Sequence, residues 1–119
     1  MLQHWVRDRP RGRRISLETA VKRQSHDTAR LYGLDDRGVI VPGTLADLNL
    51  IDMDMLRLEK PWLAFDLPAG GKRLLQRAQG YRYTIKSGVI TFEDGVWTGA
   101  TPGGVLRGPQ RAALLEAAE

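Results

Sequence analysis

The chain of 119 residues contains no cysteine, only two histidines and no long apolar run. Without cysteine, neither a disulfide nor thiolate chemistry is available, and this composition is compatible with the reducing cytoplasm. None of the apolar stretches approaches the roughly 20 residues that a membrane-spanning helix needs. Residues 1–14 carry arginines where a signal peptide needs an apolar stretch. We therefore expect a cytoplasmic protein, and the apolar fraction of 42% is typical of a globular domain.

Histidine is too scarce for a hydrolytic metal centre. A catalytic zinc ion usually takes three protein ligands from His, Cys, Asp and Glu, whereas only His4 and His26 are present and neither lies in an HxH or HExxH pattern. Asp27 follows His26 directly, so we expect the two side chains on different faces of a helix. No GxSxG nucleophile motif occurs either. We predict no catalytic and no metal-binding residue in this chain.

Acidic and glycine-rich turns are the remaining candidates for ligand binding. Four acids lie at predicted turns and strand ends, namely Asp35, Asp36, Asp52 and Asp54. They lack the loop of oxygen ligands that calcium requires, so we interpret them as solvated. The string Gly70-Gly71-Lys72-Arg73 lacks the spacing of a phosphate-binding loop and is interpreted as a positively charged turn. Asp47 opens a predicted strand, where its carboxylate can accept hydrogen bonds from turn N–H groups.

The positive charge of the chain is concentrated at its beginning. Residues 1–14 hold five of the 18 basic and one of the 14 acidic residues, so the remaining charges cancel at thirteen of each sign. The five arginines are Arg7, Arg9, Arg11, Arg13 and Arg14. Such a basic arm can bind phosphates, but it can also be a solvated loop or face acids elsewhere. No helix-turn-helix, zinc-finger or RNP-like pattern supports nucleic-acid binding.

The first regular element that the sequence predicts is a helix over residues 16–32. Ser16 is suited to its N-cap, and Gly33 is suited to the left-handed position that ends many helices. The apolar stripe of this helix is narrow, so the helix needs a larger surface to pack on. Two strands follow: a very short one at 39–41 and a second one at 48–51, separated by a Pro-Gly turn.

The clearest β pattern lies between residues 81 and 98. Apolar and polar residues alternate over 81–86, and Ser87-Gly88 can form the tight turn of a hairpin. The return strand is predicted at 89–92, followed by a second turn at Asp94-Gly95 and a brief strand at 96–98. These residues predict an antiparallel meander.

The other segments are harder to assign. Proline and glycine interrupt residues 53–80, within which 72–78 can be a helical turn or an irregular edge segment. Residues 99–110 are expected to be extended or coiled, and 111–119 are expected to form a short helix. The predicted fold is mainly β with an N-terminal helix. The expected divisions are 1–34 (basic arm and helix), 35–108 (a portion of a β-sandwich) and 109–119 (a tail, helical or disordered).

Three strings of the sequence carry a family resemblance. The first is SLETAV (16–21) with TARLYGL (28–34), and the second is DRGVIVPGTLADL (36–48). The third runs from DLPAGG (66–71) through Gly80-Tyr81, GVITFEDG (88–95) and TGA (98–100) to Pro102-Gly103. Together they resemble the C-terminal region of the amidohydrolase superfamily. The third string is specifically similar to D-aminoacylases and other N-acyl-D-amino-acid deacylases.

The resemblance implies a structural role for these strings. The first is similar to the last helix of the family's catalytic barrel, and the second to the segment that leaves the barrel and enters a small β-sandwich. The structural motif residues that the resemblance assigns are Gly38, Gly43, Ala46, Asp47, Gly88 and Gly95. One departure is Lys86-Ser87-Gly88, where the family commonly has an Asn-Gly turn. The hairpin is retained, because glycine stands at the position that needs it.

The resemblance also implies what lies outside the chain. A full-length enzyme of this family would use zinc to hydrolyse the amide bond of N-acyl-D-amino acids, with metal ligands on barrel strands that precede this region. We carry over no catalytic residue, and expect the chain alone to be inactive. Its expected partners are a catalytic barrel and N-terminal sandwich strands, or a second copy of itself. The alternatives are a stand-alone interaction module or a nucleic-acid binder that uses the basic arm.

Overall fold

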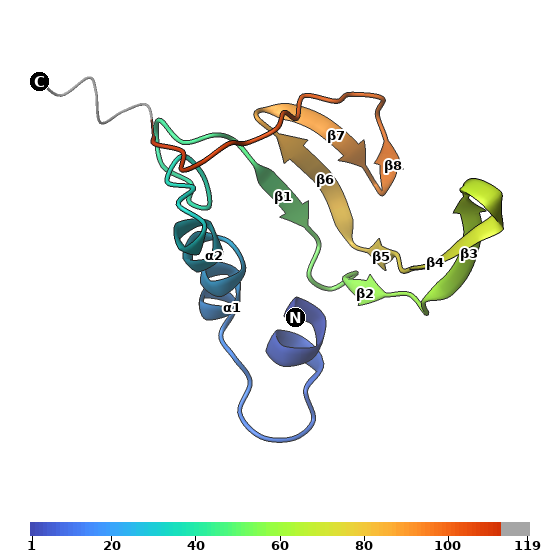
Figure 1. Cartoon of the computed structure of the whole chain (residues 1–119). Helices are drawn as coiled ribbons and strands as arrows, with labels where there is room; N and C mark the ends of the chain where they lie inside the picture. Colours follow the sequence, from blue (N-terminus) through green and yellow to red (C-terminus); the bar gives the residue numbers. More distant parts are fainter. Residues whose placement is uncertain (113–119) are drawn as a thin grey trace, which may run out of the picture.

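The computed structural model describes residues 1–112 and contains short helices followed by antiparallel β-structure (Figure 1). The helices lie at the N-terminal side: η1 (Leu2–Asp8), α1 (Leu17–Gln24) and α2 (His26–Leu31). All strands follow in the remainder of the chain, and every pair of neighbouring strands is antiparallel. The predicted fold class, mainly β with an N-terminal helix, is confirmed.

The helix predicted at 16–32 begins where expected but is divided in two. The Ser16 hydroxyl accepts a hydrogen bond from the N–H of Thr19 at 3.2 Å, which is the predicted N-cap. At Ser25 the backbone turns to φ −116° and ψ −78°, far from the values of a regular α-helix. The Ser25 hydroxyl also donates to the Val21 carbonyl at 2.6 Å. The helix is therefore broken at a serine whose side chain bonds to the preceding turn.

The end of α2 is closed by the glycine that the sequence singles out. Gly33 has φ +69°, and its N–H donates to the Arg30 carbonyl at 3.0 Å. The N–H of Leu34 donates to the Ala29 carbonyl at 2.9 Å. These two bonds form a Schellman motif, which satisfies carbonyls that the helix end leaves free.

A long, interrupted β-ribbon forms the middle of the chain. Its two arms run from residue 48 to 67 and back from 71 to 86, with the short helical turn η2 (Pro68–Gly70) at the tip. The pairs are β1 (Leu48–Ile51) with β6 (Tyr81–Lys86), β2 (Arg57–Leu58) with β5 (Ala78–Gln79), and β3 (Trp62–Leu67) with β4 (Gly71–Leu75). Of the two alternatives for 72–78, the helical turn is wrong; the segment does lie at an edge, but as strands β4 and β5 of two-stranded sheets. Most of these residues lie in strands, because they pair with residues 57–67. Local sequence patterns do not reveal such distant pairing partners.

The ribbon widens into a four-stranded sheet at its base. The strand order is β1-β6-β7-β8, where β7 is Val89–Glu93 and β8 is Val96–Trp97. Both predicted hairpin turns are present. Ser87-Gly88 has φ values of 52° and 80°, and Asp94-Gly95 has 46° and 80°. Positive φ at both central residues defines the type I′ turn that matches the twist of paired strands.

The strand predicted at residues 39–41 does not form. This segment lies in a loop between α2 and β1 and pairs with no strand among residues 1–112. The Thr44 hydroxyl hydrogen-bonds to the carbonyls of Val39 at 3.0 Å and Val41 at 2.8 Å. A run of β-branched residues does not form a strand without a pairing partner. Here the Thr44 hydroxyl bonds to the two carbonyls instead of a neighbouring strand. The Pro42-Gly43 turn is present as predicted.

The end of the described chain returns to the helices. Residues 99–110 are extended or coiled, as predicted, and Gln110 bridges to Leu34 beside the end of α2. The helix predicted at 111–119 falls largely on residues 113–119, which lie outside the described residues. Within residues 1–112, no helix is both long enough and apolar enough to cross a bilayer.

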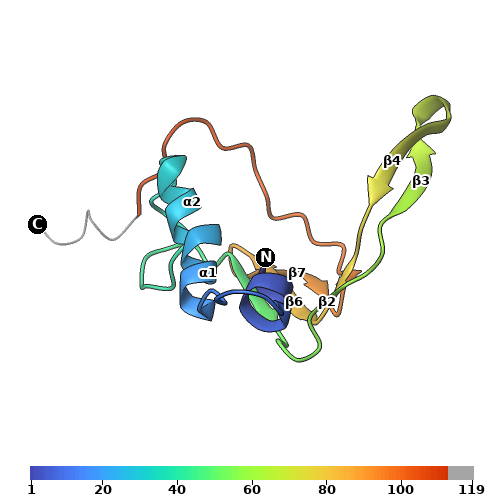
Figure 2. The same ribbon diagram turned by 90° about the horizontal axis from the view of Figure 1, so that it is seen from below.

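The described chain is open and has little core. Its buried apolar residues are Ala20, Ala29 and Leu56. The radius of gyration is 17.2 Å, compared with about 13.5 Å for a compact domain of this length. The β3–β4 hairpin extends away from the other elements (Figure 2). A chain of this shape leaves much apolar surface for other protein to cover.

Candidate functional site: an ion-pair clamp between loop and sheet

Arg37 lies at the centre of the most enclosed polar cluster of the described chain. Its Nε and Nη2 donate to the two carboxylate oxygens of Asp36, each at 2.8 Å. Its Nη1 donates to Oδ2 of Asp47 at 3.2 Å. Only 14% of the Arg37 side chain and 13% of the Asp36 side chain are exposed. The guanidinium therefore joins two carboxylates from opposite ends of the loop between α2 and β1.

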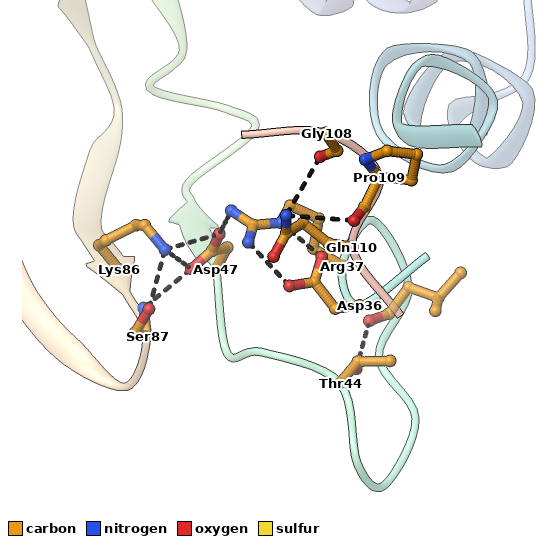
Figure 3. Close-up of polar contacts among 10 residues, drawn as sticks. Asp36, Arg37, Thr44, Asp47, Lys86, Ser87, Gly108, Pro109 and Gln110 are labelled. Carbon is orange, nitrogen blue, oxygen red and sulfur yellow. Dashed lines mark hydrogen bonds and ion pairs between the residues drawn. The ribbon is translucent and has the colours of Figure 1, made fainter. Parts of the chain in front are cut away.

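Asp47 extends this cluster to the sheet (Figure 3). Its carboxylate accepts from Nζ of Lys86 at 2.9 and 3.1 Å, and its Oδ1 accepts from the backbone N–H of Ser87 at 2.8 Å. Lys86 ends β6 and Ser87 opens the turn to β7. The structure thus gives Asp47 the role that the sequence predicts, as an acceptor for a turn N–H. We call Asp36, Arg37, Asp47, Lys86 and Ser87 the ion-pair clamp.

Backbone contacts hold the loop in the shape that the clamp requires. The N–H of Leu45 donates to the Asp36 carbonyl at 2.8 Å, which closes the loop. The N–H of Gly88 donates to the Ala46 carbonyl at 3.0 Å, beside the Asp47–Ser87 bond. Gly38, with φ +88°, packs so closely on the helices that an added Cβ would lie 2.8 Å from the Cβ of Ala29. Glycine is therefore required at this position.

The remaining motif glycines occupy turns. Gly43 has φ +86° in the loop before β1. Gly88 and Gly95 each have φ +80° in the two hairpin turns, where a Cβ added to either residue would meet no atom within 4 Å beyond its chain neighbours. These glycines are thus needed for backbone conformation, while Gly38 is also needed for close packing.

The charges of the clamp stabilise its carboxylates in the ionised form. Hydrogen bonds from Arg37 lower the pKa of Asp36, and those to Asp36 raise the pKa of Arg37. Burial opposes ionisation of Asp47, but hydrogen bonds from Lys86 and Ser87 outweigh it, so that the pKa of Asp47 is also lowered. The two negative charges of Asp36 and Asp47 equal the two positive charges of Arg37 and Lys86. Each carboxylate is bound by at least one of these basic side chains. The arrangement suits a structural joint rather than an acid–base centre, which needs a group that can gain and lose a proton.

The donor set of the described chain does not fit a hydrolytic zinc ion. Residues 1–112 contain no group of three or more His, Asp or Glu side chains that could hold a metal. His4 packs against Trp5 with ring centroids 5.3 Å apart. His26 lies with its Nδ1 3.1 Å from Oδ1 of Asp27. The expectation that His26 and Asp27 point apart is wrong, because the two side chains meet at the start of the short helix α2.

The other acidic candidates occupy turns. Asp52 accepts hydrogen bonds from the N–H groups of Asp54 and Met55, both at 3.1 Å, which is an Asx turn. Its second oxygen lies 3.6 Å from Arg82. Asp35 lies 3.7 Å from Arg30. These contacts are structural, and they do not converge on one point.

The basic segment, residues 1–14, contains regular structure in its first half. Residues 2–8 form η1, and Arg7 donates to the carbonyls of Met53 and, at 2.7 Å, Leu56. Gln3 Oε1 accepts from the N–H of Leu58 at 2.8 Å. Of the alternatives left open for residues 1–14, a solvated loop does not describe the first half, because η1 is attached to the ribbon.

The glycine-rich string at 70–73 forms the tip and first residues of a hairpin. Ala69 and Gly70 turn the chain with φ of 56° and 70°. Arg73 donates to both carboxylate oxygens of Asp66 across the hairpin, at 2.8 and 2.5 Å. Its guanidinium is therefore engaged by a carboxylate within the hairpin.

The sequence alone does not identify the partners of Asp47. Arg37 stands inside the DRG part of the second string, and Lys86 directly precedes the Ser87-Gly88 turn. Both lie beside residues that the sequence marks, but Asp47 meets Ser87 across 40 positions of the sequence. Spacing within one sequence does not show which distant residues meet.

With this geometry established, the relationship to known proteins is informative. The sequence model of the amidohydrolase family matches residues 1–92, which include the clamp and the first strands of the sheet. This chain belongs to the amidohydrolase family. Neither a curated protein nor a solved structure matched the chain.

Proposed function

We propose that this chain is the C-terminal structural portion of a metal-dependent amidohydrolase that hydrolyses the amide bond of N-acyl-D-amino acids, and that it is inactive alone. The family membership supports the reaction class. The D-specific substrate rests on the resemblance of the third string, which forms the hairpins around residues 66–71 and 88–95.

The observation that carries the structural role is the clamp itself. Arg37 and Asp47 belong to the string that resembles the passage from barrel to sandwich, and they connect the loop after α2 to the β6–β7 turn. A paired, charge-balanced cluster at such a passage would fix the angle between a catalytic domain and the sheet. Zinc, which the resemblance implies for the full-length enzyme, would be held by residues outside this chain.

The proposed partner is a catalytic barrel with accompanying sandwich strands. Large apolar side chains of the helical region remain uncovered, including Leu31 at 80% and Tyr32 at 70% exposure. The stand-alone interaction module would also use such surface. The two functions differ in what the coding sequence upstream of Met1 contains, since only the first requires an HxH-bearing barrel there.

Amine release tests the proposal directly. A protein that joins this chain to the upstream-encoded barrel should release amine from N-acetyl-D-amino acids and much less from the L-enantiomers. The chain alone with zinc should give the buffer rate. Absence of a barrel upstream, or turnover by the isolated chain, would contradict the proposal; equal rates on both enantiomers would contradict only the substrate assignment.

A further inference from the structure

The segment that joins η1 to α1 carries a cluster of positive charge that the described chain does not neutralise. We call residues 9–14 the arginine loop, after its four arginines Arg9, Arg11, Arg13 and Arg14. Among residues 1–112, no carboxylate oxygen lies within 4 Å of their guanidinium nitrogens. The adjacent Asp8 accepts hydrogen bonds from Arg7 at 2.6 and 3.1 Å. The net charge of the chain, +4, therefore equals that of this loop, because the other charges cancel in number.

Internal contacts hold the arginine loop in a closed shape. The N–H of Ile15 donates to the Trp5 carbonyl at 3.0 Å, which brings the two ends of the segment together. Nη1 of Arg9 donates to the Arg13 carbonyl at 3.1 Å. Gly12 turns the chain with φ +72°, so close to Arg9 that an added Cβ would lie 3.1 Å from Nη2. A loop ordered in this way loses less conformational entropy on binding than a flexible arm.

The arginine loop is open to solvent. Arg11, Arg13 and Arg14 are exposed, and the loop forms the lowest part of the ribbon in Figure 1, below η1 and α1 and away from the sheet. Cations crowded on such a loop favour a ligand with closely spaced negative charges. A chain of phosphates meets this requirement, because its condensed counterions are released when arginine replaces them.

An exposed aromatic ring lies beside the charges. Cζ of Arg9 lies 4.3 Å from the centroid of the Trp5 ring, in a cation–π contact. Trp5 remains 40% exposed, and His4 meets it edge-on with ring centroids 5.3 Å apart. Aromatic rings and guanidinium planes are the surfaces on which unpaired bases stack. A carboxylate or a free phosphate gains nothing from the ring, so this neighbourhood favours a single-stranded nucleic acid over other polyanions.

We propose that the arginine loop together with Trp5 binds single-stranded nucleic acid, through its phosphates and by stacking of a base, without reading its sequence. Such binding requires no helix-turn-helix or zinc finger, because phosphate contacts carry no sequence information. The surface lies apart from the ion-pair clamp, which belongs to the loop before β1 and to the β6–β7 turn. The inference does not rest on the proposed function.

The salt dependence of binding tests the phosphate contacts. Fluorescence anisotropy of a labelled oligothymidylate gives the association constant at each salt concentration. Neutralisation of four phosphates should give a slope of about −3 when the logarithm of this constant is plotted against the logarithm of the salt concentration. A wild-type chain that does not bind the oligonucleotide at low salt would overturn the proposal.

Two triple variants separate the loop from net charge. Arg11→Gln/Arg13→Gln/Arg14→Gln leaves one guanidinium in the loop, so the slope should fall to about −1. The only side-chain hydrogen bond lost is the long one from Nε of Arg14 to the Arg9 carbonyl, at 3.4 Å. The control removes three exposed positive charges elsewhere, by Lys60→Gln/Lys72→Gln/Arg107→Gln, and should keep the wild-type slope. Equal weakening in both variants would show that net charge is responsible and would overturn the proposal.

A substitution at Trp5 tests the stacking contact separately. Trp5→Leu should weaken binding about tenfold at constant salt and leave the slope unchanged, since stacking is not a charge effect. An unchanged affinity would overturn the assignment to a single strand.

Competition distinguishes nucleic acid from an acidic protein. Polyglutamate at equal charge concentration should displace the oligonucleotide poorly. Displacement as effective as that by unlabelled oligothymidylate would identify an acidic protein surface as the partner and overturn the proposal. None of these measurements involves amine release, so their failure leaves the proposed function unaffected.

Discussion

The carboxylate of Asp47 accepts a hydrogen bond from the backbone N–H of Ser87, forty residues further along the chain, at 2.8 Å. This contact fixes the start of β1 against the turn between β6 and β7. Together with Lys86 and Arg37 it connects the loop that follows the helices to the sheet. Stability of the described fold should therefore depend on Asp47 more than on other acids of the chain.

Asp47→Asn should destabilise the chain by about 1–3 kcal/mol, because it leaves Lys86 without an ionised partner and removes one of the two carboxylates that Arg37 binds. Urea unfolding monitored by tryptophan fluorescence measures the free energy of unfolding. The matched control is Asp54→Asn, the same substitution at an exposed turn acid, which should change stability little. Equal losses in both variants would show that Asp47 has no special role.

The clamp also predicts acid sensitivity. The folded-state pKa values of Asp36 and Asp47 lie below the ordinary 3.8, so the folded chain binds fewer protons than the unfolded chain as the pH falls. Their contribution to stability is present above about pH 4 and is lost as the pH decreases through the folded pKa. Urea unfolding at successive pH values should show a shallower acid decline for Asp47→Asn than for wild type; parallel curves would argue against the clamp.

Gly38 should tolerate no side chain. Gly38→Ala combines a positive φ with a Cβ placed 2.8 Å from the Cβ of Ala29, and we expect a loss of about 1–3 kcal/mol. Gly95→Ala has a similar φ but open space around the new methyl group, so it measures the backbone cost alone. Thermal unfolding should rank Gly38→Ala as the less stable of the two. The reverse order would show that the loop does not pack on the helices as described.

Arg7 should hold η1 against the ribbon, since it donates to the carbonyls of Met53 and Leu56. Arg7→Gln should accelerate amide hydrogen exchange over residues 2–8 and at Leu58, whose N–H bonds to Gln3. Arg11→Gln removes the same charge at an exposed position and should leave exchange unchanged. If both variants exchange alike, net charge rather than the Arg7 contacts controls this segment.

Features governed by neighbouring residues could be predicted from the sequence. Ser16 caps α1 and Gly33 ends α2 because each acts within a few residues of its own position. The turns at Ser87-Gly88 and Asp94-Gly95 are likewise set by the conformational range of their own residues. For Asp47, the sequence indicated the kind of contact, an acceptor for a turn N–H.

Features that depend on pairing with residues distant in the sequence could not be predicted from it. Residues 72–75 form a strand because Leu75 and Leu74 meet Trp62 and Leu63, and nothing local distinguishes that outcome from a helical turn. The run at 39–41 has strand-forming residues but no pairing partner among residues 1–112. The identities of Arg37 and Lys86 as partners of Asp47 also depend on the tertiary fold. Propensity selects candidates, whereas pairing decides among them.

Zinc content after metal loading tests the central claim most directly, namely that this amidohydrolase chain contributes a structural joint and not the hydrolytic centre. The purified chain is equilibrated with zinc, passed through a desalting column and analysed by atomic spectroscopy. We predict much less than one zinc ion per chain, because neither His4 nor His26 belongs to a group of three potential metal ligands among residues 1–112. One tightly held zinc ion per chain, lost when His4 or His26 is replaced by alanine, would contradict the account.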